Sequence, residues 1–146
     1  MTKRAMALLL VFAQFTLLFF LIAYTSGKIL PPHSVFFFLL SFILASWSVS
    51  VMMKSKLRVT PVPAKDARLV ADGPYRFIRH PMYTSVLLAV SGLLIIHFSY
   101  FRLLLAVFLL VVLLLKLNWE EKMLSEKFTD YRKYKQLTRK LIPFIY

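Results

Sequence analysis

The chain has 146 residues, 60% of them hydrophobic, and it contains no cysteine. The length fits a single domain over residues 1–146, and so apolar a composition is typical of a membrane protein. The absence of cysteine excludes disulfides, thiolate metal sites and a cysteine nucleophile. The net charge is +13. Because most basic residues flank apolar runs, we expect contacts with membrane lipids and no nucleic-acid partner.

Four apolar segments predict transmembrane helices. The first, residues 5–25, follows Lys3 and Arg4 and is long enough to cross a bilayer. A cleaved signal peptide is the alternative, but the apolar run is long for one and no Ala-x-Ala site follows it. The other predicted spans are residues 34–53, 81–100 and 101–117. The last two have so short a link that they should form an antiparallel hairpin.

Two polar segments complete the chain. Residues 54–80 form a basic loop, in which Asp72-Gly73-Pro74 is a turn signal. In the tail, residues 118–146, apolar and aromatic side chains recur every three to four positions above a basic face. This pattern predicts an amphipathic helix on the membrane surface or folded back over the bundle. The expected fold class is therefore all-α integral membrane, with about four transmembrane helices plus a C-terminal amphipathic helix.

The distribution of Lys and Arg predicts the orientation in the membrane. The N-terminus, the 54–80 loop and the tail are rich in these residues, whereas the links 28–33 and 97–102 carry one each. Four spans place the basic segments on one side, and the positive-inside rule makes that side cytoplasmic. Both termini should then be cytoplasmic.

The stretch from Gly73 to Tyr83 gathers polar side chains where the loop meets the third span. His80 precedes a proline, so a loop should end at His80 and a helix begin at Pro81. A helix N-terminus with guanidinium and imidazole groups suits an anion or a carboxylate. The alternative is an ordinary basic juxtamembrane loop, and the residue types alone do not separate the two.

Glu120 and Glu121 follow the fourth span directly and should return to the same face as His80. Acidic residues favour the first turn of a helix, which explains one glutamate better than two beside a membrane. An acidic pair facing a basic, aromatic patch can hold a zwitterionic, cationic ligand. The other histidines, His33 and His97, are too scattered to form a local metal motif with His80, and no metal site is expected.

Together the two constellations resemble the isoprenylcysteine carboxyl methyltransferase family of integral membrane enzymes, in the form of a small bacterial or archaeal member. They resemble the phospholipid methyltransferases more distantly. The family pattern is Gly-x-Tyr-x-x-x-Arg-His-Pro-x-Tyr, then Glu-Glu-x-x-Leu, Phe-Gly-x-x-Tyr-x-x-Tyr and Ile-Pro. The matching residues are Gly73, Tyr75, Arg79, His80, Pro81, Tyr83, Glu120, Glu121, Leu124, Phe128, Tyr131, Tyr134, Ile142 and Pro143.

The chain departs from that pattern at three positions. Ser85 and Thr129 stand where glycine is usual, and Trp119 stands where many members carry arginine next to the acidic pair. Lys116 is then the nearest cation. These departures bear on how anionic groups of a ligand are held more than on the fold.

The resemblance implies a methyltransferase that uses S-adenosyl-L-methionine and methylates a lipophilic acceptor at the cytoplasmic face, in a small prokaryotic member at the inner membrane. It implies catalytic roles for Arg79, His80 and Glu120. The donor-binding residues that it implies are Tyr75, Arg79, His80, Pro81, Tyr83, Glu120 and Glu121. No Rossmann glycine fingerprint is present, so a soluble methyltransferase fold is not expected. The identity of the acceptor and the oligomeric state stay open.

Two other classes compete with this interpretation. An NADPH-dependent membrane reductase of the sterol-reductase type also carries a His-Pro-x-Tyr stretch, but it reads His-Pro-Asn-Tyr followed by Gly-Glu, which Met82 and Ser85-Val86 do not fit. A non-catalytic membrane protein on the same scaffold is the second alternative. If the methyltransferase interpretation holds, we expect the acceptor to enter sideways from the bilayer, with the serines of the second span and the region of Ser85 and Leu88 as walls.

Overall fold

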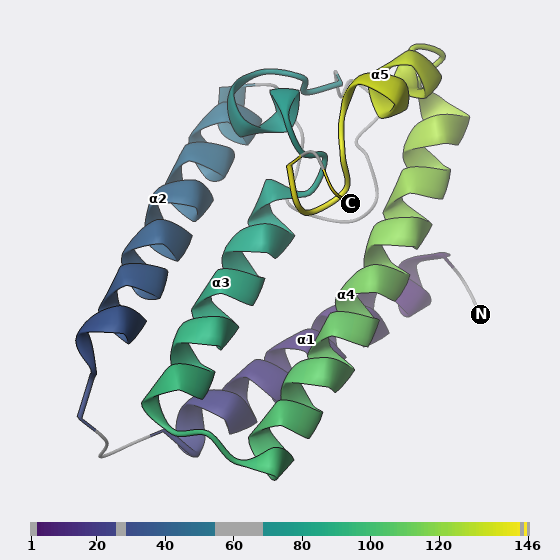
Figure 1. The fold of residues 1–146 in the computed structure, drawn as a ribbon. Helices are drawn as coiled ribbons and strands as arrows, with labels where there is room; N and C mark the ends of the chain where they lie inside the picture. Colours follow the sequence, from purple (N-terminus) through teal and green to yellow (C-terminus); the bar gives the residue numbers. More distant parts are fainter. Residues whose placement is uncertain (1–2, 26–28, 55–68, 144, 146) are drawn as a thin grey trace.

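The computed structural model describes residues 3–25, 29–54, 69–143 and 145, which form a helical bundle (Figure 1). The helices are α1 (Lys3–Ala23), α2 (Pro32–Lys54), the 3₁₀ helix η1 (Gly73–Arg76), α3 (Pro81–Ile96), α4 (Tyr100–Lys127) and α5 (Tyr131–Leu137). Among the described residues, α1, α2 and α4 contain segments long and apolar enough to cross a membrane, and α3 is apolar but shorter. The predicted all-α membrane fold is confirmed. Most of the expected 54–80 loop, residues 55–68, lies outside the described residues.

Helix α4 continues ten residues beyond the predicted fourth span, which was expected to end with the apolar run. Its 28 residues extend about 42 Å, more than the ~30 Å hydrocarbon core of a bilayer. The part after Leu117 therefore projects beyond the apolar bundle as a helical stem, and it carries Glu120 and Glu121. The tail helix is correspondingly short, since α5 has only 7 residues.

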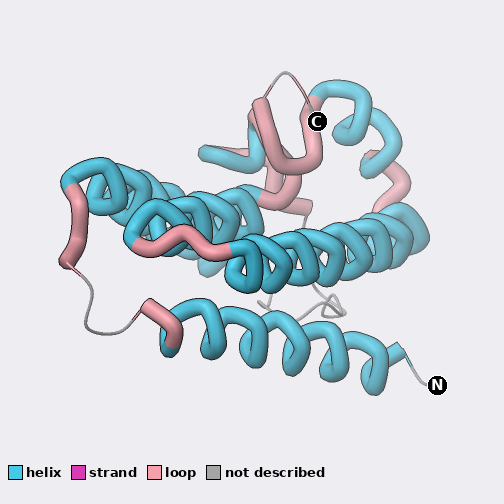
Figure 2. The backbone as a smooth tube through the Cα atoms, turned by 60° about the horizontal axis from the view of Figure 1, so that its bottom comes forward, coloured by secondary structure: helices cyan, strands magenta, loops and turns pink. Residues whose placement is uncertain are grey.

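The bundle is built from two closely packed pairs, α2 with α3 and α1 with α4. Figure 2 shows α1 as a layer of its own beside the α3–α4 hairpin. Helices α2 and α3 approach closely, since a Cβ atom on Gly92 would lie 3.0 Å from the Phe38 ring. The Ser41 hydroxyl also donates to the Ser85 carbonyl at 2.7 Å. Ser41 thus joins the second span to α3, whereas Ser48 and Ser50 donate to carbonyls of their own helix.

The apolar core lies between α1, α3 and α4. Its buried members are Leu21 of α1, Val90 and Leu93 of α3, and Leu109 and Leu113 of α4. These residues occupy the middle of the bundle and the end where α3 is linked to α4. The opposite end of the same helices is polar.

Arg102 is buried at the linked end and is 1% exposed. Its guanidinium donates to the carbonyl oxygens of Leu93, at 2.7 Å, and His97, and to the Thr25 hydroxyl at 2.5 Å. A longer contact of 3.4 Å reaches the Leu21 carbonyl. Carbonyl groups in the last turn of a helix lack partners within the helix and favour a positive charge. Arg102 therefore caps the ends of α1 and α3 from the first turn of α4.

The end of the bundle that carries His80 gathers segments that are distant in sequence, and we call it the functional end. Figure 1 shows η1, α5 and the C-terminal segment together beside the N-terminal turn of α3, whereas the α1–α2 and α3–α4 links lie at the other end. The two short links thus lie at one end and the basic tail at the other, as the distribution of Lys and Arg predicted. The side of the membrane on which the functional end lies stays a prediction.

Gly73 sets the position of η1 against α2. Its φ of +57° lies in the left-handed region, which glycine adopts at little cost. A Cβ atom there would lie 2.8 Å from Val51 Cγ2 and 3.1 Å from Trp47 Nε1. The glycine of the turn signal thus allows the backbone to come against α2 and places Tyr75 at the start of the site.

Candidate functional site

The C-terminal tail pairs with the segment before α3. The Arg79 N–H donates to the Arg139 carbonyl at 2.7 Å, the His80 N–H donates to the Lys140 carbonyl at 3.1 Å, and the Arg139 N–H donates to the Phe77 carbonyl at 3.1 Å. This pairing includes a single parallel bridge between Ile78 and Arg139. The backbone around His80 is therefore fixed by the tail, and the His80 N–H is not free for a ligand.

Helix α3 begins at Pro81, as predicted, with proline at the first helical position and His80 before it. Pro81 is fully buried. This start places Tyr83 one turn from His80, and their rings stack with centroids 5.4 Å apart and planes 4° apart. The start of α3 at Pro81 therefore places the imidazole and the phenol beside each other.

The two carboxylates of α4 meet this ring pair. Glu120 Oε1 accepts a hydrogen bond of 2.5 Å from the Tyr83 hydroxyl. Glu120 Oε2 lies 3.7 Å from His80 Nδ1, and Glu121 Oε1 lies 3.6 Å from His80 Nε2. Consecutive glutamates on one helix therefore face the two nitrogens of a single imidazole.

Arg79 joins Glu121 to the tail. Its Nε–H donates to Glu121 Oε1 at 2.6 Å. Its Nη1 donates to the carbonyls of Thr138 and Lys135 and to the Thr138 hydroxyl. The Lys135 ammonium lies 3.1 Å from Glu121 Oε2. Both cations are thus used to hold the Glu121 carboxylate, and much of the Arg79 guanidinium is engaged within the protein.

Three buried polar atoms at this end have no hydrogen-bond partner among the described residues. They are the Tyr75 hydroxyl, His80 Nε2 and the Tyr131 hydroxyl. The three residues are 5%, 8% and 1% exposed. A buried polar group without a partner costs about 1–3 kcal/mol, so each of these atoms needs an explanation. A polar ligand beside the acidic pair would satisfy them.

The phenols of the site stay neutral. Burial, and then the charge of Glu120, raise the pKa of Tyr75 well above its usual value. Burial and the charge of Glu121 do the same to the pKa of Tyr131. Burial also raises the pKa of Tyr134, whose hydroxyl donates to the Tyr75 carbonyl at 2.7 Å. Since neutral phenols carry a proton, Tyr75 and Tyr131 can donate hydrogen bonds to a ligand.

Lys116 lies one turn before Glu120 on α4. Its ammonium donates to Gln14 Oε1 of α1 at 3.0 Å and lies 5.0 Å from the centroid of the Tyr83 ring. Lys116 and Gln14 are each 7% exposed. The sequence marked Lys116 as the cation nearest the acidic pair, and Gln14 interrupts the apolar run of residues 5–25. Nothing in the sequence indicated that the two would meet.

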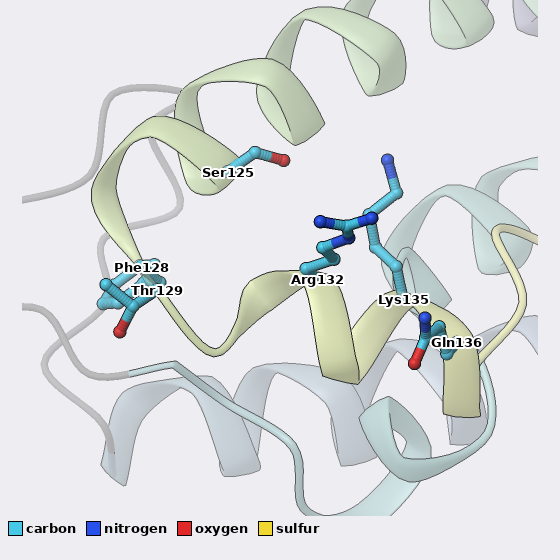
Figure 3. Close-up of a pocket in the computed structure, with 6 residues that line it drawn as sticks. All are labelled: Ser125, Phe128, Thr129, Arg132, Lys135 and Gln136. Atoms are coloured by element: carbon cyan, nitrogen blue, oxygen red, sulfur yellow. The ribbon is translucent and has the colours of Figure 1, made fainter.

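A cleft of about 640 Å³ opens between the end of α4 and α5 (Figure 3). Figure 3 shows the side chains of Arg132 and Lys135 extending into the space between the two helices. The lining residues are Ser125, Phe128, Thr129, Arg132, Lys135 and Gln136. Because Lys135 also contacts Glu121, the cleft adjoins the acidic pair on its tail side.

All the site residues predicted from the sequence gather at this end of the bundle. They are Tyr75, Arg79, His80, Pro81, Tyr83, Glu120 and Glu121. Thr138 and Lys135 were not predicted, because the stripe of aromatic residues in the tail gives no register for the backbone pairing that follows it. Their roles depend on the contact with Arg79.

The family model of the phospholipid methyltransferases matches residues 33–131, which include the His80 stretch and both glutamates. Comparisons with curated proteins and with solved structures find no match. Because the family match covers more than half of the chain and includes the two segments that build the site, the protein belongs to the phospholipid methyltransferase family.

Proposed function

We propose that this membrane methyltransferase transfers the methyl group of S-adenosyl-L-methionine to a lipophilic acceptor at the cytoplasmic face. Family membership supports methyl transfer to a lipid. The observation that carries the finer proposal is the set of three unpartnered buried polar atoms, on Tyr75, His80 and Tyr131, beside two carboxylates. A site with donors and carboxylates in one place suits a ligand that carries both signs of charge.

The side chains fit the chemical groups of this donor. Glu120 and Glu121 are suited to its ammonium or to ribose hydroxyls, which donate hydrogen bonds. The stacked rings of His80 and Tyr83 offer aromatic faces to a sulfonium or to adenine. When bound, S-adenosyl-L-methionine supplies an electrophilic methyl group, whose transfer to a lone pair on the acceptor leaves a neutral thioether.

The donor carboxylate needs a cation or N–H groups. Arg79 was expected to supply part of this contact, but its Nε and Nη1 are engaged with Glu121 and Thr138. We therefore propose that Arg79 mainly positions Glu121, and that the donor carboxylate lies toward the cleft near Arg132, since Lys135 also holds Glu121. This cleft, open to water, would be the route by which the soluble donor enters.

His80 has two proposed roles. Its imidazole lies between the carboxylates of Glu120 and Glu121, at 3.7 and 3.6 Å, and its Nε2 has no hydrogen-bond partner among the described residues. A carboxylate or thiolate acceptor needs no proton removal, whereas an amine releases a proton on methylation. For an amine acceptor we propose that His80 accepts this proton at Nε2.

We propose an acceptor route other than the one expected from the sequence. The region of Ser85 was expected to form a wall of a gap between the second and third spans, but Ser85 is 4% exposed and its carbonyl is bonded to Ser41 of α2. Helices α2 and α3 are in close contact there. We therefore propose that the acceptor approaches between α3 and the α1–α4 pair, which are less closely packed than either pair.

The test separates the proposed function from its alternatives. The purified protein in lipid nanodiscs should gain thermal stability with S-adenosylhomocysteine and none with NADPH, and it should transfer labelled methyl groups to an extracted lipid. His80→Ala should abolish donor stabilisation, whereas His33→Ala, at an exposed position on α2, should leave it unchanged. Stabilisation by NADPH alone would favour the reductase, and a response to neither ligand would favour a non-catalytic protein.

A further inference from the structure

Two cations hold the Glu121 carboxylate, and they differ in how firmly they are fixed. Arg79 Nε lies 2.6 Å from Glu121 Oε1, and the two side chains are 7% and 5% exposed. Lys135 Nζ lies 3.1 Å from Glu121 Oε2, but the Lys135 side chain is 41% exposed. The Arg79 guanidinium also donates to oxygen atoms of the tail, whereas the one described ion pair of the Lys135 ammonium is that to Glu121.

The exposure of Lys135 makes its ion pair the weaker of the two. An ion pair near solvent contributes little, because water screens the charges and a long side chain must be ordered to form it. The backbone of Lys135 is held in place, since its carbonyl accepts a hydrogen bond of 3.2 Å from Arg79 Nη1. Only the flexible side chain of Lys135 would therefore have to move. Glu121 thus has one permanent and one exchangeable cation.

The cleft between α4 and α5 gives the Lys135 ammonium a second position. The side chains of Lys135 and Arg132 both line this cleft (Figure 3). An anion in the cleft could bind Arg132 together with an ammonium released from Glu121. A ligand cation at Glu121 and a ligand anion in the cleft would then be bound through the movement of one side chain.

We propose that Lys135 makes the site selective for a ligand that carries an ammonium and a carboxylate together. Lys135 pairs with Glu121 until the ammonium of the donor replaces it, and the Lys135 ammonium then turns to the donor carboxylate beside Arg132. A ligand with an ammonium alone leaves Lys135 without a carboxylate, and a ligand with a carboxylate alone finds Lys135 still paired with Glu121. This inference rests on the proposed function, because it concerns recognition of the same methyl donor.

The first test uses the wild-type protein in nanodiscs and a set of ligands that differ in charge. They are S-adenosylhomocysteine, with both charges, its decarboxylated and deaminated analogues, with one charge each, and methylthioadenosine, with neither. Removal of both charges should cost less affinity than the sum of the two single removals, because Lys135 couples the two contacts. Calorimetric titration measures the affinities. Additive losses would show that the two charges are bound independently and would overturn the proposal.

The second test removes the lysine. Lys135→Met should bind the decarboxylated analogue more tightly and S-adenosylhomocysteine more weakly than the wild type does. The preference between them should fall about tenfold, as the loss of one hydrogen bond to a charged group predicts. Lys135→Arg should keep the preference. Lys133→Met removes the same charge from an exposed position on α5 and should leave the preference unchanged. Equal losses for the two ligands would mean that Lys135 only supports the fold and would overturn the proposal.

The two tests separate this inference from the proposed function. A wild-type protein that binds none of these ligands would contradict both. A wild-type protein that binds S-adenosylhomocysteine, but shows additive losses across the ligand set, would contradict the inference alone. If Lys135→Met does not fold, the comparison of ligands in the wild-type protein decides by itself.

Discussion

Tyr83 of α3 donates a hydrogen bond of 2.5 Å to Glu120 of α4, although 37 positions separate the two residues. The bond joins the two arms of the hairpin at the functional end and holds the Glu120 carboxylate beside His80. A hydrogen bond contributes about 0.5–1.5 kcal/mol when both groups are neutral, and about 1.5–3 kcal/mol when one of them is charged. The orientation of Glu120 is therefore set by the Tyr83 hydroxyl on one oxygen and by the His80 imidazole beside the other.

Replacement of that hydroxyl tests its role in donor binding. Tyr83→Phe should weaken the affinity for S-adenosylhomocysteine roughly tenfold, because the ring stack with His80 is kept while Glu120 loses its donor. Calorimetric titration of the purified variant measures the change. Tyr100→Phe, at an 85% exposed position, is the matched control. Tyr83→Phe with wild-type affinity would mean that the donor does not depend on Glu120.

Neutralisation of Glu121 should weaken the backbone pairing between the tail and the segment before α3. Glu121→Gln leaves the buried Arg79 guanidinium without its carboxylate, and removal of one partner of a buried pair costs about 3–5 kcal/mol. Hydrogen exchange of the Arg79 and His80 amides should speed up, because both are bonded to the tail. Asp130→Asn, at an exposed position, serves as control.

The double variant gives a sharper result for the same pair. Arg79→Met with Glu121→Met should lose less stability than the sum of the two single changes, since no charge is left buried alone. Denaturant titration in detergent measures the three variants. Additive losses would show that the two side chains act independently, against the structure.

A methyl group at Gly73 should displace η1. Gly73→Ala should destabilise the protein by about 1–3 kcal/mol, because its φ of +57° is unfavourable for alanine and the new Cβ would lie 2.8 Å from Val51 Cγ2. The neighbouring change Asp72→Ala should have little effect, since the Asp72 side chain makes no capping hydrogen bond. A fully stable Gly73→Ala protein would contradict the described turn.

The orientation in the membrane can be tested on a background without native cysteine. Leu30→Cys, in the link between α1 and α2, should be labelled by an impermeant reagent from outside the cell. Thr129→Cys, exposed between α4 and α5, should be labelled only after the membrane is permeabilised, as should a cysteine at position 65. Labelling of Leu30→Cys and Thr129→Cys from one side would contradict the positive-inside prediction.

The apolar runs and the start of α3 could be predicted from the sequence, because hydropathy and the His80-Pro81 step are local signals. The end of α4 could not. Residues such as Glu121 and Lys122 end an apolar run, but they are good helix formers and so continue the helix. The prediction therefore placed the helix boundary at the expected membrane boundary, although the two are set by different physical causes.

The sequence motifs predicted which residues form the site, but they could not predict which partners these residues contact in the fold. The motifs named His80 and both glutamates. The pairing of the tail with Arg79 depends on a short backbone register, and single bridges of this kind have no signature in sequence. The contact between Lys116 and Gln14 joins residues 102 positions apart, and it follows from how α1 crosses α4.

The cap that Arg102 forms has a mechanical consequence for the bundle. One guanidinium fastens the last turns of α1 and α3 to the first turn of α4, and the apolar core lies next to it. At the opposite end the same helices meet through side-chain pairs such as Tyr83–Glu120 and Lys116–Gln14. We therefore expect the Arg102 end to stay closed, so that any opening that admits donor and lipid would take place at the end of Tyr83 and Glu120.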